Sequence, residues 1–316
     1  MVKQRREIEK LKPYEPVLFE ARYKLDANEN AYDIPPAVKR KIIKAAGKTD
    51  FNRYPDPLCG KLKKTLAKKI GMTLENIAVG NGSDELISYL MQAFVSPGDR
   101  VVIPVPSFDV YEIAAKIAGA RIVKIPLSEE FDLDEKRMMR NVSEKKTKMV
   151  IIGYPNNPTG NCFSRRKVEN IIYGTKGLVV IDEAYFEFSG KSFMNAVKKR
   201  KNIVVLRTFS KAFSMAALRV GYMVASRDIV SAVNKVRMPY NVNGISQRAA
   251  LIALENSALM QDSIYKIIIE REKMAGVIGG DYEYCGGDAN FFLIKVNDAA
   301  KAEKIFRKNR IYVRVF

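Results

Sequence analysis

"TFSKAFSMAALRVGY", residues 208–222, places a single lysine, Lys211, among small and apolar side chains. Arg219 is the only other charged residue of this stretch. A solvated surface helix of the same length would carry more charged residues. Burying an unpaired ammonium group is expensive, so a lysine in such surroundings is usually paired, neutral or used covalently. The pattern of the rest of the chain has to decide among these three roles.

Apolar runs without polar alternation occur along most of the chain, and segments of helical periodicity separate them. Such runs are typical of strands buried on both faces of a mostly parallel sheet. The pattern therefore predicts an α/β protein with a seven-stranded sheet flanked by helices, including a helix over residues 83–95 that Ser83 caps. The expected strands are residues 76–80, 100–104, 121–127, 148–154, 177–185, 202–209 and 221–226.

The pattern changes beyond Arg227, where helical periodicity dominates and two expected strands, the last at residues 311–316, close the chain. This tail and the N-terminal segment suit a smaller α+β domain. We expect residues 30–245 to form the large domain and residues 1–29 with 246–316 to form the small one.

The composition excludes several kinds of catalysis. The chain of 316 residues contains no histidine, which removes histidine triads, histidine metal ligands and histidine general bases. Its three cysteines, Cys59, Cys162 and Cys285, are isolated, and no pair has metal-ligand spacing. We therefore expect neither a metal site nor a disulfide framework. If the chain is an enzyme, its proton transfers depend on lysine, carboxylates, tyrosine or a cofactor.

The net charge of +19 comes from lysines and arginines distributed along the whole chain. Most lie in short clusters where amphipathic helices are expected, which favours a solvated basic surface that attracts anionic substrates over a nucleic-acid partner. The chain has no apolar run of about 18 residues, so we expect no membrane span. The charged N-terminus lacks a signal-peptide core, which predicts a cytoplasmic protein.

Polar residues follow several of the expected strands, at the edge where open α/β sheets bind ligands. The turn after residue 80 could present the backbone N–H groups of Gly82, Ser83 and Asp84 to a phosphate. Taken singly, each such residue is also typical of a turn, a cap or a strand end, whereas the set in this order indicates a site. Its other members are Asn156, Asn157, Asp182, Tyr185, Thr208, Ser210 and Lys211.

Three motifs in this order, "YPNNPTG", "DEAY" and "TFSKAFSMAALRVGY", are similar to those of fold-type I pyridoxal-phosphate aminotransferases. Further segments resemble the histidinol-phosphate aminotransferase branch: "LKPYEP", "LDANEN", "NRYPDP", "VGNGSDE", "PVPSF" and "SQRAALIAL". The likeness runs from about Leu11 to Arg314. It implies the cofactor pyridoxal 5'-phosphate and, in histidine biosynthesis, interconversion of L-histidinol phosphate and 2-oxoglutarate with imidazole-acetol phosphate and L-glutamate.

Other activities remain open at this point. An aromatic amino-acid aminotransferase and a threonine-phosphate decarboxylase share the same fold. A basic protein that binds nucleic acid without a cofactor is the remote alternative, and the net charge is its only support.

The resemblance gives the residues of the opening stretch and its neighbours specific roles. Lys211 is implied to form the Schiff base with the cofactor aldehyde, and it must then be neutral to carry a proton. Desolvation and nearby cations must therefore lower its pKa from about 10.4. Asp182 is implied to pair with the protonated ring nitrogen, and Tyr185 and Asn157 to bond the ring oxygen. Phe108 is implied to stack on the ring.

The resemblance also implies a phosphate site and a substrate side. Arg219 would hold the cofactor phosphate, because a bidentate guanidinium suits such an anion. Tyr54 would be donated by the neighbouring subunit of a homodimer with shared sites. The remaining phosphate contacts are Gly82, Ser83, Asp84, Thr208 and Ser210, and the substrate side contains Tyr14, Asn28, Asn157 and Arg314.

One departure from the family pattern concerns the end of the chain. The family has a further arginine, shortly after the position of "VRVF", that binds the substrate α-carboxylate, whereas this chain stops at Phe316. We expect the sequence to be shortened, with carboxylate binding by another group or impaired catalysis as the alternatives. Loss of one charged hydrogen bond to a carboxylate would cost about 1.5–3 kcal/mol in substrate binding.

Overall fold

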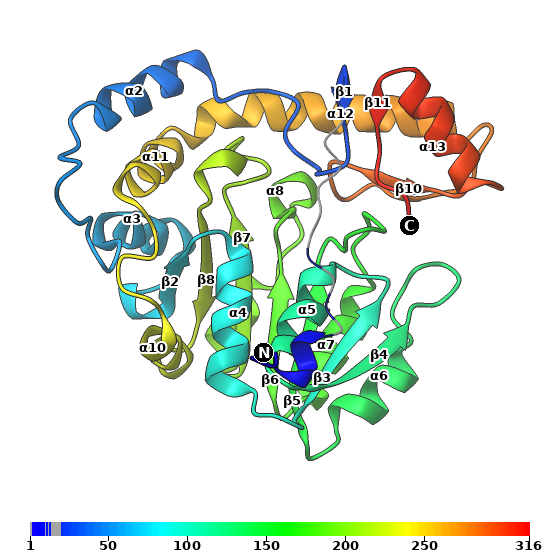
Figure 1. Ribbon diagram of the computed structural model, residues 1–316, viewed down its shortest axis with the longest axis horizontal. Helices are drawn as coiled ribbons and strands as arrows, with labels where there is room; N and C mark the ends of the chain where they lie inside the picture. The colour runs from blue at the N-terminus through cyan, green and yellow to red at the C-terminus, as the bar shows by residue number, and fades with distance from the viewer. Residues whose placement is uncertain (1, 10, 12, 14–19) are drawn as a thin grey trace.

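The computed structural model describes residues 2–9, 11, 13 and 20–316 and is built around one large twisted sheet (Figure 1). Its strand order is β2-β8-β7-β6-β5-β3-β4. The pairs from β4 through β7 are parallel, whereas β8 runs antiparallel to both β7 and β2, which confirms the predicted seven-stranded, mostly parallel sheet. The strands are Ile77–Gly80 (β2), Arg100–Val105 (β3), Arg121–Pro126 (β4), Thr147–Gly153 (β5), Leu178–Asp182 (β6), Ile203–Thr208 (β7) and Gly221–Ala225 (β8).

The central strands are buried on both faces, which explains their unbroken runs of valine and isoleucine. Val150 and Val205 belong to the apolar cluster on one face, and Ile151 and Leu206 belong to the cluster on the other. Helices cover both faces and leave the carboxyl ends of the parallel strands free to carry polar residues.

The helices that cover the sheet and extend beyond it are amphipathic or short. In chain order they are Arg6–Glu9 (α1), Pro36–Ala46 (α2), Gly60–Ile70 (α3), Ser83–Phe94 (α4), Asp109–Ile117 (α5), Glu135–Val142 (α6), Arg165–Gly174 (α7), Phe186–Ser189 (α8), Met194–Lys199 (α9), Arg227–Val236 (α10), Gly244–Glu255 (α11), Gln261–Ile278 (α12) and Ala299–Lys308 (α13). None of the helices in the described part of the chain combines the length and apolar character needed to cross a membrane.

Two short sheets lie outside the large one. Tyr23–Lys24 (β1) pairs in parallel with Ile311–Tyr312 (β11), so the N-terminal segment and the end of the chain meet. Tyr284–Gly286 (β9) pairs antiparallel with Phe292–Ile294 (β10), and the long helix α12 runs from the side of α11 toward this pair (Figure 1). The division of the chain at residues 30 and 245 stays a prediction.

Two local expectations differ from the structure. The expected strand at 311–316 is limited to β11, because only its first residues find a partner strand. Ser83 is not the cap of α4: it is the first helical residue, and the cap position belongs to Gly82, whose φ of +82° suits glycine. No side chain caps this helix, so its first N–H groups stay available to a ligand.

Replacing Gly221 by alanine should destabilise this fold. A Cβ at this position would collide with the backbone N of Ser83 and lie 2.5 Å from the carbonyl carbon of Gly82. Both belong to the turn that opens α4, so we expect a loss of about 1–3 kcal/mol in the free energy of unfolding, measured by urea denaturation. Gly276→Ala is the control, since no atom outside its chain neighbours and the backbone of its own helix lies within 4 Å of a Cβ at that position. Equal stability of the two variants would contradict the packing argument.

Candidate active site

A cavity of about 470 Å³ lies at the carboxyl ends of β5, β6 and β7. Its walls combine these strand ends with the start of α4, the start of α5 and the segment 26–28, which comes from far away in the sequence. Most of the residues predicted from the sequence line this one cavity, although their individual roles stay predictions. They are Asn28, Ser83, Asp84, Phe108, Asn157, Asp182, Tyr185, Thr208, Ser210, Lys211, Arg219 and Arg314.

The start of α4 and the guanidinium of Arg219 form a cradle suited to an anion. Gly82 is required here, because a Cβ on it would lie 2.7 Å from Nη2 of Arg219. Arg219 itself has a φ of +51° and donates to the hydroxyl of Ser210 at 3.3 Å and to Asp84 Oδ2 at 3.0 Å. A helix N-terminus, a guanidinium and a hydroxyl together fit a phosphate group.

The hydroxyl of Thr208 orders the loop that carries the lysine. It accepts a hydrogen bond from the backbone N–H of Ser210 at 3.1 Å and donates to the carbonyl of Val220 at 3.3 Å. Thr208 thereby connects the end of β7 to the segment that leads into β8. The Ser210 hydroxyl is held beside Arg219 as a consequence.

The Lys211 ammonium group lies inside the cavity and donates to the backbone carbonyl of Ala27 at 2.6 Å. The pKa of Lys211 is lowered to about 8: burial is the main cause, the charges of Arg219 and Lys24 act in the same direction, and those of Asp84 and Glu29 oppose it. The sequence predicted this direction and both kinds of cause. A lysine with this pKa is partly neutral near neutral pH and can accept a proton.

Asp182 ends β6 at the floor of the cavity and is only 4% exposed. Burial raises its pKa to about 6, and the hydroxyl of Tyr111, which donates to Oδ2 at 2.8 Å, opposes this rise. The backbone N–H of Ala184 donates to the other oxygen at 3.1 Å. Asp182 is therefore mostly anionic at neutral pH.

The segment 26–30 contacts Lys211 and its loop and also reaches Tyr185. Asn28 donates to the hydroxyl of Tyr185 at 3.1 Å, and Asn30 donates to the backbone carbonyls of Lys211 and Ala212, each at 3.3 Å. The ring of Tyr185 packs edge-on against Phe291 at 5.0 Å. The motif "LDANEN" thus holds the loop of Lys211 as well as lining the cavity.

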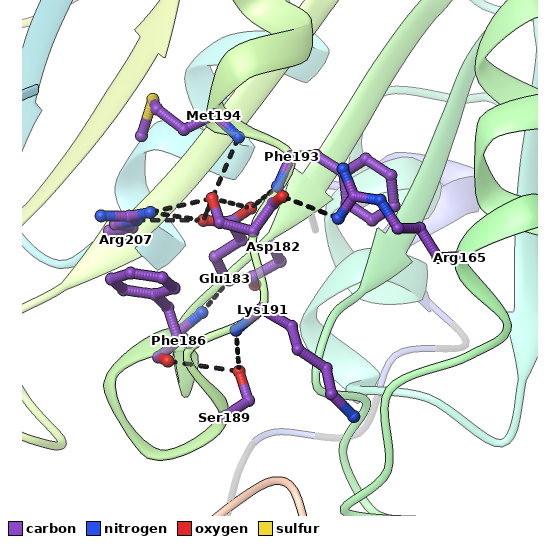
Figure 2. Close-up of polar contacts among 11 residues, drawn as sticks. Arg165, Asp182, Glu183, Phe186, Ser189, Lys191, Phe193, Met194 and Arg207 are labelled. Carbon is purple, nitrogen blue, oxygen red and sulfur yellow. Dashed lines mark hydrogen bonds and ion pairs between the residues drawn. The ribbon is translucent and has the colours of Figure 1, made fainter. Parts of the chain in front are cut away.

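A buried ion pair supports the strand end that carries Asp182 (Figure 2). Both Nε and Nη2 of Arg207 donate to Glu183 Oε2, at 3.0 and 2.8 Å. The other oxygen of Glu183 accepts from the backbone N–H of Phe193 at 2.6 Å, and the guanidinium lies 3.6 Å from the ring centre of Phe186. Because both charges are desolvated and paired with each other, this network fixes the backbone on either side of Glu183.

Several residues in or near the site were not predicted from the sequence. Tyr111 lies on the buried face of α5 with Ala114 and Ala115, where only its hydroxyl indicates a polar partner. Arg207 lies inside a buried strand, and a charged residue in such a run could have indicated a buried ion pair. Asn30 belongs to the motif "LDANEN", but the sequence predicted no role for it.

Tyr14 lies outside the described residues. Three other predicted residues, Asn156, Gly82 and Tyr54, are not part of the cavity lining. Asn156 is fully buried, and its Nδ2 donates to the carbonyl of Pro106 at 3.1 Å and to the hydroxyl of Thr159 at 2.8 Å, so it holds the turn after β5. Gly82 forms part of the cradle beside Arg219. Tyr54 is 80% exposed and stacks on Tyr240 with ring centres 4.4 Å apart. Arg314 does line the cavity, and its Nη2 donates to Asp109 at 2.7 Å. Within the part of the chain that the structure describes, no group of cysteine and carboxylate side chains could hold a metal ion.

Comparison with known proteins agrees with this geometry. The family model described as "Aminotransferase class I and II" matches residues 22–315. The chain belongs to this aminotransferase family. The histidinol-phosphate aminotransferase of Caldanaerobacter subterraneus subsp. tengcongensis is 41% identical over 315 residues, covering 99% of this chain and 89% of the relative. That of Aquifex aeolicus is 43% identical over 276 residues, covering 87% and 77%.

Solved structures of aminotransferases share the fold. Histidinol-phosphate aminotransferase from Clostridium acetobutylicum superposes with a TM-score of 0.83 at 26% identity, covering 92% of this chain and 88% of that one. The enzyme of the same name from Sinorhizobium meliloti, solved in complex with pyridoxal-5'-phosphate, gives a TM-score of 0.90 at 24% identity. The superposition covers 99% of this chain and 89% of the Sinorhizobium meliloti chain.

The amine of Lys211 should react with an acylating reagent at lower pH than an exposed lysine does. Its labelling rate should reach half of the maximum at about pH 8, because burial lowers its pKa to about 8. Lys266 is the internal control, since a hydrogen bond to Asp262 raises its pKa. Brief labelling across the neutral and alkaline range, followed by peptide mass spectrometry, measures both residues. If the labelling rates of Lys211 and Lys266 reached half of their maximum at the same pH, the desolvation of Lys211 would be contradicted.

Proposed function

We propose that this chain is a pyridoxal-phosphate-dependent transaminase that interconverts L-histidinol phosphate and 2-oxoglutarate with imidazole-acetol phosphate and L-glutamate. One observation carries the chemistry: Lys211, Asp182 and Arg219 line the same cavity, with an amine, a buried carboxylate and an anion cradle. The choice of substrate rests on relatives of about 40% identity over 99% of the chain that bear the name of that enzyme. A biosynthetic role of this kind would place the enzyme in the cytoplasm.

The residues that line the cavity match the chemical groups of pyridoxal phosphate. The cradle at Arg219 suits its phosphate, Asp182 suits its ring nitrogen, and Phe108 offers an aromatic face at the cavity wall. Tyr185 and Asn157 lie in the same lining and can donate to its ring oxygen. Pyridoxal phosphate, when bound, supplies an aldehyde that condenses with amines and a ring that withdraws electrons from the neighbouring carbon.

Lys211 is the group that moves a proton at the α-carbon of the substrate. With a pKa of about 8, roughly a tenth of the free amine is neutral at pH 7, which is several hundred-fold more than at an ordinary lysine pKa. Asp182 would act on the cofactor ring. As an anion it would accept a hydrogen bond from the ring nitrogen of bound pyridoxal phosphate and would keep that nitrogen protonated.

The anionic end of the substrate would meet the outer wall of the cavity. Arg314 and Arg219 supply the guanidinium groups of the described lining, and Arg219 is committed to the cradle. We assign the substrate's phosphate or carboxylate to Arg314, with Asn28 and Asn157 beside it. Asp109 holds the Arg314 side chain in place at 2.7 Å.

The function is tested with Lys211→Ala and with a panel of substrates. Addition of pyridoxal phosphate to the natural protein should produce a visible absorption band, and borohydride should fix the cofactor to Lys211. Lys211→Ala should lose both, whereas Lys266→Ala, an exposed control, should keep them. A band retained by Lys211→Ala would refute the assignment.

The substrate panel separates the related activities. With 2-oxoglutarate as acceptor, kcat/KM should be highest for histidinol phosphate. A preference for phenylalanine would indicate an aromatic amino-acid aminotransferase instead, and release of carbon dioxide from threonine phosphate would indicate the decarboxylase.

We further propose a homodimer in which Tyr54 reaches the phosphate site of the neighbouring subunit. Tyr54 is not part of the lining of its own cavity and lies in an exposed apolar surface, and such surfaces commonly form interfaces. A hydrogen bond from Arg237 to the carbonyl of Pro57, at 2.8 Å, joins the two segments that build it. The exposed apolar residues are Phe51, Tyr54, Leu58, Met238 and Tyr240.

Shared sites predict complementation between two defective variants. Tyr54→Ala should bind pyridoxal phosphate weakly, and Lys211→Ala should bind it without the visible band. Unfolding and refolding the two together should produce heterodimers with one complete site, so that the band returns at low cofactor concentration. Refolding each variant alone is the control. Absence of recovery in dimers shown to be mixed would contradict the donation of Tyr54.

A further inference from the structure

Tyr111 and Asp182 form a hydrogen-bonded pair at the floor of the cavity, and the pair comes from different elements. Tyr111 lies on α5, one turn after Phe108, and is 2% exposed. Its hydroxyl donates to Asp182 Oδ2 at 2.8 Å across the carboxyl end of the sheet. Both residues also line the cavity, so a ligand bound there can contact the hydrogen-bonded pair directly.

The bond leaves the carboxylate able to accept from a ligand. A carboxylate offers about four acceptor positions. Tyr111 uses one on Oδ2 and the backbone N–H of Ala184 uses one on Oδ1, at 2.8 and 3.1 Å. Donors on both oxygens fix the rotation of the carboxylate, and positions remain for a ring N–H. A freely rotating carboxylate would have to be ordered each time a ligand bound.

The neighbouring carboxylates oppose the ionisation of Asp182. Asp84 on α4 and the adjacent Glu183 both raise its pKa, in addition to burial. Glu183 is compensated by Arg207 on β7, at 2.8 Å, and Lys211 and Arg219 face the same cavity. The Tyr111 hydrogen bond is the largest effect that lowers the pKa of Asp182.

Tyr111 remains a donor throughout the neutral range. Burial and the charge of Asp182 raise the pKa of Tyr111 well above its ordinary value, so the phenol keeps its proton. The ring packs edge-on against Phe108, with centres 5.6 Å apart and planes at 88°. Removal of the oxygen alone would leave this ring contact intact.

We propose that Tyr111 is a positioning residue that holds Asp182 ionised and oriented for the ring nitrogen of the cofactor. The assignment rests on the proposed function, because it requires a basic ring nitrogen at Asp182. The proposal gives different roles to the two groups that donate hydrogen bonds to the Asp182 carboxylate. The Ala184 amide belongs to the backbone turn, whereas Tyr111 is a side chain that a single substitution can remove.

Tyr111→Phe tests the role through cofactor affinity as a function of pH. Loss of the donor should raise the pKa of Asp182, so Asp182 becomes protonated at higher pH and the acid side of the affinity profile moves upward. We expect a shift of about one pH unit and about fivefold weaker binding of pyridoxal phosphate near pH 6, with a smaller loss in alkaline solution. Quenching of tyrosine fluorescence or the visible band measures the dissociation constant.

A cofactor analogue distinguishes this role from a merely structural one. The analogue carries carbon in place of the ring nitrogen and cannot use the charge of Asp182, so Tyr111→Phe should leave its affinity unchanged. In an Asp182→Asn background, Tyr111→Phe should likewise have no further effect on pyridoxal phosphate. Equal weakening of both cofactor forms, or an unshifted pH profile, would overturn the proposal.

Tyr89→Phe is the matched control. Tyr89 is also a buried tyrosine that donates to a carboxylate, Glu85, at 3.0 Å, but it lies outside the cavity lining. Its loss should leave the pH profile of cofactor binding unchanged, and a shift equal to that of Tyr111→Phe would also overturn the proposal. Failure of the natural protein to bind pyridoxal phosphate would instead refute the proposed function.

Discussion

The site depends on the shared desolvation of Lys211 and Asp182. Burial lowers the pKa of the lysine to about 8 and raises that of the aspartate to about 6, so the two values approach each other around neutral pH. Water would stabilise both charges and separate these values again. Hydrogen bonds from fixed groups keep each residue in place: the carbonyl of Ala27 accepts from the lysine, and Tyr111 and Ala184 donate to the aspartate.

The sheet makes this desolvation possible because its strand ends are rigid. β6 delivers Asp182 and β7 leads to Lys211, and both strands are buried throughout. The ion pair between Glu183, which directly follows β6, and Arg207 on β7 connects the two strands, so they are held together by charge as well as by the ladder (Figure 2). A flexible loop could place the same residues, but it would admit water and return both pKa values to the ordinary range.

Much of this arrangement could be predicted from the sequence, and the limit has a physical cause. Unbroken apolar runs identified the strands, and the motifs at their ends identified Asp182, Lys211 and Arg219. Tyr111 and Arg207 were missed, because their importance depends on which side chain they meet across the fold. The wrong cap assignment at Ser83 has the same origin: spacing shows that a helix starts, whereas the position of Gly82 against Arg219 is a tertiary constraint.

The ion pair between Arg219 and Asp84 determines how the cradle accepts an anion. Both side chains are 43% exposed, and exposed pairs of this kind contribute about 0–1 kcal/mol, so a phosphate can displace the carboxylate at little cost. Asp84 lies in the first turn of α4, where the helix dipole continues to stabilise its charge after it leaves Arg219. The pair therefore keeps the guanidinium ordered before binding. It also favours an anion that can use Arg219, Ser210 and the free N–H groups of α4 together, which a tetrahedral phosphate does better than a planar carboxylate.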